Sequence, residues 1–288
     1  MTASDDRRVP ELGPLVVPGS EDIDHHAVVA LVALPVSCAA PAQAVCTGTL
    51  IAPRIVLTAA HCLKSLPSGR AEAVVGRSID AADARHIPIV ETLRHPGWVS
   101  PSHDVALALL AEDAGVAPIA LVDATFGARI ADSLVTLVGY GRDQFERTGT
   151  RRSGTARAFE TTPEHFRVRP EPVLSCSGDS GGPALVAVDG VPRIAGVASY
   201  GDPMCVGVAT YARVDIELAA FIEPGVERLR HTNTPPPPAP EPCAKGGTEE
   251  TGGCALPPRA PAHAGDAPIL LLTLLAALAW RTRFGGRA

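Results

Sequence analysis

The sequence predicts an all-β fold, either a sandwich or a barrel. Short runs rich in Val, Ala and Leu recur along residues 18–224, and turn residues separate them. The chain contains 28 Pro and 27 Gly, which fits many turns, and 46% hydrophobic residues, enough for a globular core. One segment in this range, DIELAAFIE at 215–223, has its apolar residues at helical spacing instead.

The expected strands each end at a turn signal or a polar cluster. The first run, 27–36, is apolar, but it follows the acidic, histidine-containing stretch EDIDHH, so we interpret it as a strand. The segment 215–223 is expected to form one closing helix that ends at Pro224-Gly225. The runs expected to form strands are 27–36, 49–60, 71–76, 86–95, 104–110, 133–141, 182–190 and 192–201.

Composition and charge restrict the function. The net charge of −6 argues against a broad nucleic-acid surface, which is normally basic. Seven cysteines are enough for a couple of disulfides in an oxidising compartment, with at least one cysteine left over. The opening MTASDDRRVPELG lacks the apolar core of a signal peptide. Export would then require another start or an unconventional signal.

The last part of the sequence differs in character. A proline-rich linker (234–242) and a polar, glycine-rich stretch (245–253) precede Cys254, an apolar run (269–280) and a cluster of arginines. The run is shorter than the roughly 20 residues that span a bilayer. One interpretation is a tail helix docked on the body. The order of these parts also resembles the tripartite C-terminal sorting signals of bacterial envelope proteins, including the myxobacterial type, which implies envelope anchoring.

The stretch CSGDSGGPAL, residues 176–185, places Ser180 among small turn residues. It could be an ordinary solvated turn. Alternatively, Ser180 is a nucleophile, which requires a base and a group that orients the base. Among nine histidines, His61 stands out because it ends an apolar run in VLTAAHC, where a bridge between Cys46 and Cys62 would pin its loop. His103 should not pair with the adjacent Asp104, since neighbours in an extended chain point opposite ways.

Five motifs occur in order: CTGTLIAPRIVLTAAHC, HDVALALL, SCSGDSGGPAL, VASYG and TYARV. Together they resemble the chymotrypsin/trypsin-like serine peptidases over most of residues 16–224. The resemblance implies two antiparallel six-stranded β-barrels packed face to face, a C-terminal helix, and an active site in the cleft between the barrels. It divides the chain into an N-terminal segment and candidate propeptide (1–15), an N-terminal barrel (16–117), a C-terminal barrel with its helix (118–231), a linker (232–267) and an apolar anchor (268–288).

The resemblance also implies roles for single residues. Ser180 would be the nucleophile, His61 its base, and Asp104 the group that holds the imidazole. Gly178 and Ser180 would donate two backbone N–H groups to the oxyanion. The bridges implied are Cys46–Cys62 and Cys176–Cys205.

The same resemblance predicts the substrate pocket. Leu174 is expected at its base, where trypsin-like members that bind basic side chains keep an aspartate. We therefore expect cleavage after Leu, Phe, Met or Ala to exceed cleavage after Lys or Arg at least about tenfold. The residues expected to bind substrate are Leu174, Ser175, Ser199, Tyr200, Gly201 and Ala209.

The activation site departs from the family. Asp179 matches the aspartate that captures a newly exposed N-terminal amine. Val16 begins the nearest match to the family's Ile-Val-Gly-Gly start, but Pro18 replaces a glycine and Leu15 replaces the usual Lys or Arg. Activation by a trypsin-like enzyme is therefore not expected, and an unprocessed loop is the alternative.

Taken together, these motifs predict a serine endopeptidase acting through an acyl-enzyme. The rival prediction is a non-catalytic surface binding module on the same fold. Neither a metal nor an organic cofactor is implied. The expected partners are protein or peptide substrates and not nucleic acid. We expect a monomer that is exported to the cell envelope, the cell surface or the medium.

Overall fold

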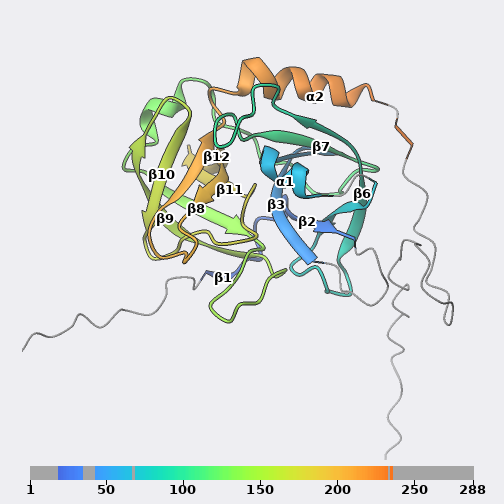
Figure 1. Cartoon of the computed structure of the whole chain (residues 1–288), viewed down its shortest axis with the longest axis horizontal. Helices are drawn as coiled ribbons and strands as arrows, with labels where there is room; N and C mark the ends of the chain where they lie inside the picture. Colours follow the sequence, from blue (N-terminus) through green and yellow to red (C-terminus); the bar gives the residue numbers. More distant parts are fainter. Residues whose placement is uncertain (1–18, 35–42, 67–68, 233, 236–288) are drawn as a thin grey trace, which may run out of the picture. The chain divides into compact units, whose positions relative to one another are not determined.

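The computed structural model describes residues 19–34, 43–66, 69–232 and 234–235, which form two β-barrels (Figure 1). The N-terminal barrel is closed, with the strand order β2-β3-β4-β7-β6-β5, and every neighbouring pair is antiparallel. Its strands are β2 (Val28–Ala33), β3 (Gln43–Ala52), β4 (Ile55–Thr58), β5 (Ala71–Val75), β6 (Arg85–Arg94) and β7 (Ala106–Leu110).

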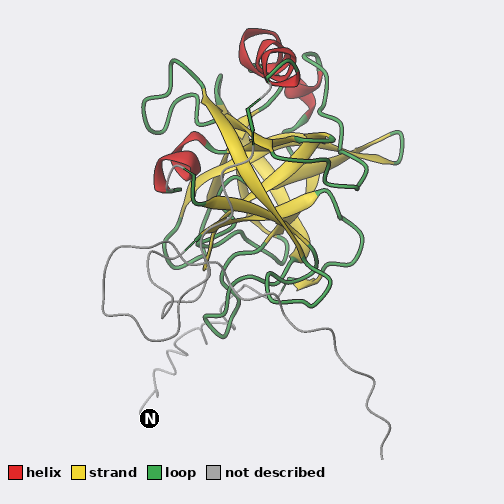
Figure 2. Cartoon of the chain, turned by 90° about the vertical axis from the view of Figure 1, so that its right-hand side faces the viewer, coloured by secondary structure: helices red, strands yellow, loops and turns green. Residues whose placement is uncertain are grey.

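The C-terminal barrel also has six antiparallel strands. Strand β8 pairs with both β11 and β9 and so closes the ring β8-β9-β10-β13-β12-β11, and the short β1 (Ser20–Glu21) adds to β9. The prediction of two six-stranded barrels is therefore confirmed, and Figure 2 shows the strands from the side. The barrel strands are β8 (Leu134–Gly139), β9 (Arg152–Thr161), β10 (His165–Pro170), β11 (Pro183–Val188), β12 (Val191–Gly201) and β13 (Ala209–Arg213).

Small aliphatic side chains fill both barrels, since only 4% of the residues are aromatic. Every residue of β7 is buried, and so are five of the six in β2. Each Val or Leu taken from water in this way stabilises the fold by about 1.5–3 kcal/mol. In the second barrel the stacked rings of Phe166 and Tyr211, 5.5 Å apart, add a larger packing unit.

The helices are short. Helix α1 (Ala60–Ser65) follows β4, η1 (Phe126–Arg129) lies between the barrels in the sequence, and a π-helical turn, η2 (Leu218–Ile222), leads into α2 (Glu223–Arg230). The predicted closing helix exists, but the prediction that it ends at Pro224-Gly225 is wrong. Pro224 lies in the first turn of α2, where its missing N–H is not needed. A Cβ on Gly225 would lie 2.6 Å from Leu107 Cδ1, so the glycine allows α2 to pack closely on β7.

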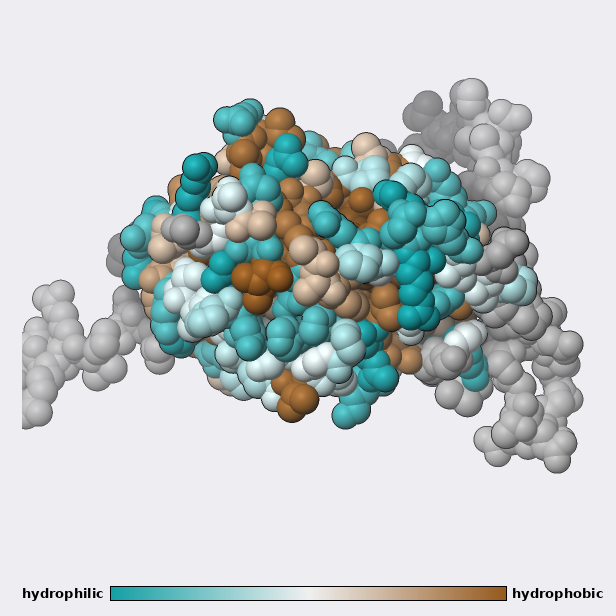
Figure 3. Space-filling model, turned by 90° about the horizontal axis from the view of Figure 1, so that it is seen from above, coloured by the Kyte–Doolittle hydropathy of each residue, from teal (hydrophilic) through white to brown (hydrophobic). Residues whose placement is uncertain are grey.

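A groove of about 840 Å³ lies beside this helical stretch and is lined by apolar residues such as Phe126 and Ile222 together with charged ones such as Arg129. Figure 3, seen from above Figure 1, shows apolar residues grouped near the middle of the upper face. None of the predicted site residues lines the groove. Within the described residues, no helix is both long and apolar enough to cross a membrane, and the apolar run 269–280 lies outside them.

Candidate active site

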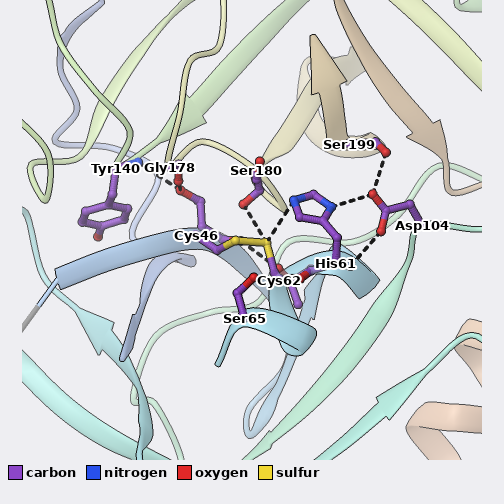
Figure 4. Close-up of a disulfide and its surroundings, with 11 residues drawn as sticks. Cys46, His61, Cys62, Ser65, Asp104, Tyr140, Gly178, Ser180 and Ser199 are labelled. Atoms are coloured by element: carbon purple, nitrogen blue, oxygen red, sulfur yellow. Dashed lines mark hydrogen bonds and ion pairs between the residues drawn. A yellow bond between two sulfur atoms is a disulfide. The ribbon is translucent and has the colours of Figure 1, made fainter. Parts of the chain in front are cut away.

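The residues predicted for catalysis come from both barrels. His61 lies in α1, just after β4, and Asp104 lies two residues before β7. Ser180 lies in the loop that precedes β11 of the second barrel. Cys62 Sγ is 3.8 Å from His61 Nε2 and 3.4 Å from the carbonyl oxygen of Ser180. His61 of the first barrel and Ser180 of the second therefore lie close together where the barrels join (Figure 4).

Asp104 holds the His61 imidazole in place. Its Oδ1 accepts the backbone N–H of His61 at 2.9 Å, and its Oδ2 lies 2.7 Å from His61 Nδ1 and accepts the Ser199 hydroxyl at 2.6 Å. Burial alone would raise the pKa of the Asp104 carboxyl, but the hydrogen bonds from His61 and Ser199 outweigh it and hold this pKa below its usual value. An ionised Asp104 accepts a hydrogen bond from the N–H of His61 Nδ1, which leaves the lone pair of His61 on Nε2.

Ser180 is fixed through its backbone. Its carbonyl accepts the Thr47 N–H at 2.8 Å, a bond between the two barrels. Among the described residues, no hydrogen bond joins the Ser180 hydroxyl to His61 Nε2. Such bonds are often long without substrate and shorten when it binds.

The loop before Ser180 depends on glycine. Gly178 has φ +94°, and a Cβ there would lie 2.9 Å from the Cα of Gly141. Gly181 has φ +81°, and its Cβ would lie 2.4 Å from the carbonyl oxygen of Thr47. In the described part of the chain, the backbone N–H groups of Gly178 and Ser180 donate to no protein acceptor. Both can therefore bind the oxygen of a ligand.

Thr47 also holds this loop, a role that the sequence did not suggest. Its buried hydroxyl donates to the carbonyl of Gly178 at 2.8 Å and accepts the backbone N–H of Tyr140 at 3.0 Å. Thr47 follows Cys46 directly in CTGTL, and this adjacency is the only local signal that it lies near the site.

A cavity of about 130 Å³ opens beside Ser180. Of the six residues predicted to bind substrate, five line it: Ser175, Ser199, Tyr200, Gly201 and Ala209. Leu174 does not line it. Leu174 is buried and lines a neighbouring cavity of about 30 Å³ next to Asp179.

Asp202 is the one charged residue among the described residues that line the cavity beside Ser180. Its carboxylate accepts the backbone N–H groups of Met204, Val206 and Gly207 at 3.0, 3.0 and 2.8 Å. These bonds lower the pKa of Asp202 and hold the ionised carboxylate on its own loop. The carboxylate is thus committed to its own loop.

Two disulfides fix the site. The predicted bridges Cys46–Cys62 and Cys176–Cys205 are both present, with Cα–Cα distances of 6.0 and 5.2 Å. Together they include all four cysteines of the described residues. The Cys46–Cys62 bond lies beside His61, and Cys176 of the second bridge lines the cavity beside Ser180. Cys46, His61 and Cys62 also bring potential metal-ligand atoms within 4.8 Å of one another, but both sulfurs are in the disulfide and cannot ligate as thiolates.

Asp179 is enclosed beside the small cavity that Leu174 lines. Its two oxygens accept the N–H groups of Gly141 and Cys176, both at 2.8 Å, and within the described residues no Lys or Arg pairs with it. Burial raises the pKa of the Asp179 carboxyl to about 6, although the two backbone bonds oppose the shift. Gly19 lines the same cavity, whereas Val16 lies outside the described residues.

Comparisons with known proteins agree with this architecture. Residues 18–222 match the family model Trypsin. The chain is 30% identical to a trypsin of Saccharopolyspora erythraea over 209 residues, which cover 64% of this chain and 86% of that protein. It is also 30% identical to a cercarial protease of Schistosoma mansoni over 193 residues, 55% of this chain and 71% of that protein. The fold and these matches define a trypsin-like serine peptidase. The chain belongs to the trypsin family.

Proposed function

We propose that this trypsin-family chain is a serine endopeptidase in which Ser180, His61 and Asp104 form the catalytic triad. The observation that carries the proposal is the Asp104 carboxylate, which bonds both His61 and Ser199 and so presents Nε2 toward the Ser180 loop. Neither a lone core histidine nor a solvated turn serine needs this arrangement.

In the proposed reaction each of these residues has a distinct role. The Ser180 Oγ attacks the substrate carbonyl carbon while His61 Nε2 takes its proton, and the oxyanion accepts the N–H groups of Gly178 and Ser180. His61 then protonates the leaving amine, and the acyl-enzyme forms. Water attacks the ester with His61 again as base, which releases the acid and restores Ser180. Asp104 stays ionised and stabilises the imidazolium.

A fluorophosphonate probe tests the nucleophile. Ser180→Ala should abolish labelling of the processed chain and leave its thermal unfolding unchanged. The matched control is Ser177→Ala, an exposed serine of the same loop, which should still be labelled. Labelling that survives in Ser180→Ala would assign the nucleophile elsewhere.

For specificity, we propose a preference for an apolar side chain before the scissile bond. The one carboxylate that lines the cavity beside Ser180, Asp202, is held by three backbone N–H groups of its own loop. A lysine or arginine would have to compete with these N–H groups for the carboxylate, so it would be desolvated with a weakened counter-charge. A discrimination of about 1.4 kcal/mol is enough for the expected tenfold preference.

A peptide library read with the processed enzyme decides the preference. Cleavage after Leu, Phe, Met or Ala should dominate, and Ala209→Asp, which places a carboxylate in the cavity, should shift cleavage toward Lys and Arg. A parent enzyme that prefers Arg or Lys would refute this view of the pocket.

For activation, we propose that Asp179 captures the amine of Val16 once the chain is cut before it. Support comes from the buried carboxylate, which lacks a cation partner in the described residues, and from the small cavity beside it that Gly19 also lines. Labelling by the fluorophosphonate should therefore rise after cleavage before Val16. Equal labelling of the uncut chain would contradict the proposal.

The rival is a non-catalytic binding module, which the departures from the family's activation site at Leu15 and Pro18 favour. The peptidase and the binding module are expected to behave differently once the chain is cut before Val16. A binding module stays unlabelled and inactive, whereas the peptidase gains both labelling and turnover. The presence of all three triad residues favours the peptidase.

For localisation, the two disulfides and the family suggest a secreted or extracellular protein. We propose envelope anchoring through the segment after the proline-rich linker, which lies outside the described residues. The full chain should fractionate with the envelope, and a chain truncated before Thr234 should be released as a soluble, active peptidase. A truncated chain that still sediments with membranes would contradict the anchor.

A further inference from the structure

Two histidines and a buried glutamate meet at the edge of the first barrel. His95 directly follows β6, His103 lies three residues before β7, and Glu217 directly precedes η2, near the helix at the top of Figure 1. His95 Nε2 lies 3.3 Å from one oxygen of Glu217, and His103 Nδ1 lies 2.8 Å from the other. The two imidazole rings stack with centroids 4.4 Å apart.

The carboxylate of Glu217 lacks a permanent counter-charge. It is 4% exposed, and in the described part of the chain no Lys or Arg pairs with it. A neutral imidazole is the form that binds metal. A buried anion between two imidazoles is thus a suitable place for a cation.

The distances fit a small divalent ion. One nitrogen of each histidine and one oxygen of Glu217 lie within 4.8 Å of one another. A tetrahedral zinc ion with bonds of about 2.0–2.1 Å holds its ligand atoms roughly 3.3 Å apart. The contact between His95 and Glu217 already has this length. The two stacked imidazoles must tilt away from parallel, so that the lone pair of each ring points at the ion.

We propose that His95, His103 and Glu217 form a binding site for zinc or a similar divalent transition-metal ion, with water as the fourth ligand. Two nitrogens and one carboxylate with an open position are a known zinc ligand set. His103 is 35% exposed and leaves a path for the ion and for the water.

Binding requires each histidine to move its proton to its other ring nitrogen. In the apo chain, His95 Nδ1 accepts the backbone N–H of Gly97 at 3.0 Å, and this bond is lost when Nδ1 carries the proton. Gly97 is exposed, so its N–H can turn to water. His103 Nε2 can donate to solvent. The new N–H of His95 Nδ1 has no protein acceptor among the described residues, and it must reach water through the 11% of this side chain that is exposed.

The site adjoins the candidate active site without sharing a ligand with it. His103 precedes Asp104. The carbonyl oxygen of Pro101 in the same loop accepts a hydrogen bond from His165 Nε2, and the His165 ring contacts Tyr200 of the cavity beside Ser180. A bound ion would thus tether the loop 95–103 to the start of η2. This proposal does not depend on catalysis, so an inactive chain can test it.

The test uses the full-length chain with Ser180→Ala, freed of metal by a chelator, and titrated with Zn²⁺ by calorimetry. One ion should bind per chain and raise the unfolding temperature. His95→Gln and His103→Asn should each weaken binding at least about tenfold. The matched control is His86→Gln, since His86 pairs with Glu72 at 2.9 Å but belongs to no three-ligand cluster of the described residues. Co²⁺ bound to the Ser180→Ala chain with both histidines intact should give the visible absorption bands of a four-coordinate ion.

Two results would overturn the proposal. One is the absence of saturable zinc binding, or binding that neither His95→Gln nor His103→Asn weakens. The other is binding lost in His61→Asn alone, which would assign the ion to the triad. Glu217→Gln is a third variant, and if it does not fold, the two histidine variants still decide.

Discussion

Removal of the Thr47 hydroxyl should show whether Thr47 positions the loop before Ser180 or only fills space in the core. Thr47→Val keeps the shape of the side chain but deletes its bonds to the Gly178 carbonyl and the Tyr140 N–H. Thr49, two residues further along β3, is the matched control because its hydroxyl is buried with no hydrogen-bond partner. Both positions face the same side of the strand.

The two variants should differ in the sign of their effect on stability. Thr47→Val leaves the N–H of the fully buried Tyr140 and the Gly178 carbonyl without partners, and each unsatisfied group costs about 1–3 kcal/mol. We expect the free energy of unfolding to fall by roughly 2–4 kcal/mol. Thr49→Val replaces an unpaired buried hydroxyl with a methyl and should be neutral or slightly stabilising.

The effect on catalysis should appear in kcat. The Gly178 carbonyl belongs to the peptide between the two proposed oxyanion donors, so a loosened loop weakens transition-state binding more than substrate binding. Loss of one oxyanion donor costs about 10²–10³ in kcat, and misalignment should cost roughly 10–100-fold with little change in KM. Thr47→Ser should restore most of the rate. Equal kcat values for the two valine variants would refute the positioning role.

Two further predictions concern pH and the disulfides. The pKa of Asp179, about 6 against a usual 3.8, means that the uncut folded chain holds this proton more tightly than the unfolded chain, so stability falls as pH rises from about 4 to 6. In the Ser180→Ala background, the free energy of unfolding in urea should fall by at most about 2–3 kcal/mol across that window, and Asp179→Asn should abolish this fall. Parallel pH profiles of the two chains would contradict this. Replacing the cysteines of either bridge by alanine should cost about 3–4 kcal/mol, since the bridges close 16 and 29 residues of chain. Loss of Cys46–Cys62 should mainly lower kcat and loss of Cys176–Cys205 mainly raise KM, and identical kinetic effects would count against these roles.

Local sequence predicted those parts of the molecule whose signals lie in one stretch. The run 104–110 is apolar in every residue after Asp104, and the strand β7 that it predicts is buried throughout. Strand β9 was not predicted, because RSGTARAFET contains glycine and charged residues and has only two buried positions. Its polar face points to solvent, so the pairing with β8 and β10 decides its structure. The end of the last helix was misplaced because Pro224 reads as a stop, although proline also suits a first turn.

Contacts between distant residues could not be predicted in this way. Thr47 and Gly178 are 131 positions apart, and His103 and Glu217 are 114 apart, so barrel register and docking decide which hydroxyl or carboxylate meets which partner. His95 and His103 each read as isolated residues in the sequence, since Glu217 gives no local sign that it faces them.

Leu174 is the one residue of the six predicted to bind substrate that does not line the cavity beside Ser180. Counting back from Ser180 put this residue at the base of the substrate pocket, but consecutive residues of an extended chain point to opposite sides. Ser175 faces the cavity beside Ser180, and Leu174 packs in the core beside Asp179. The proposed apolar preference therefore rests on the neutral walls at Ser175 and Ala209 and on the occupied carboxylate of Asp202. The side chain of Leu174 contributes to the surroundings of Asp179 instead.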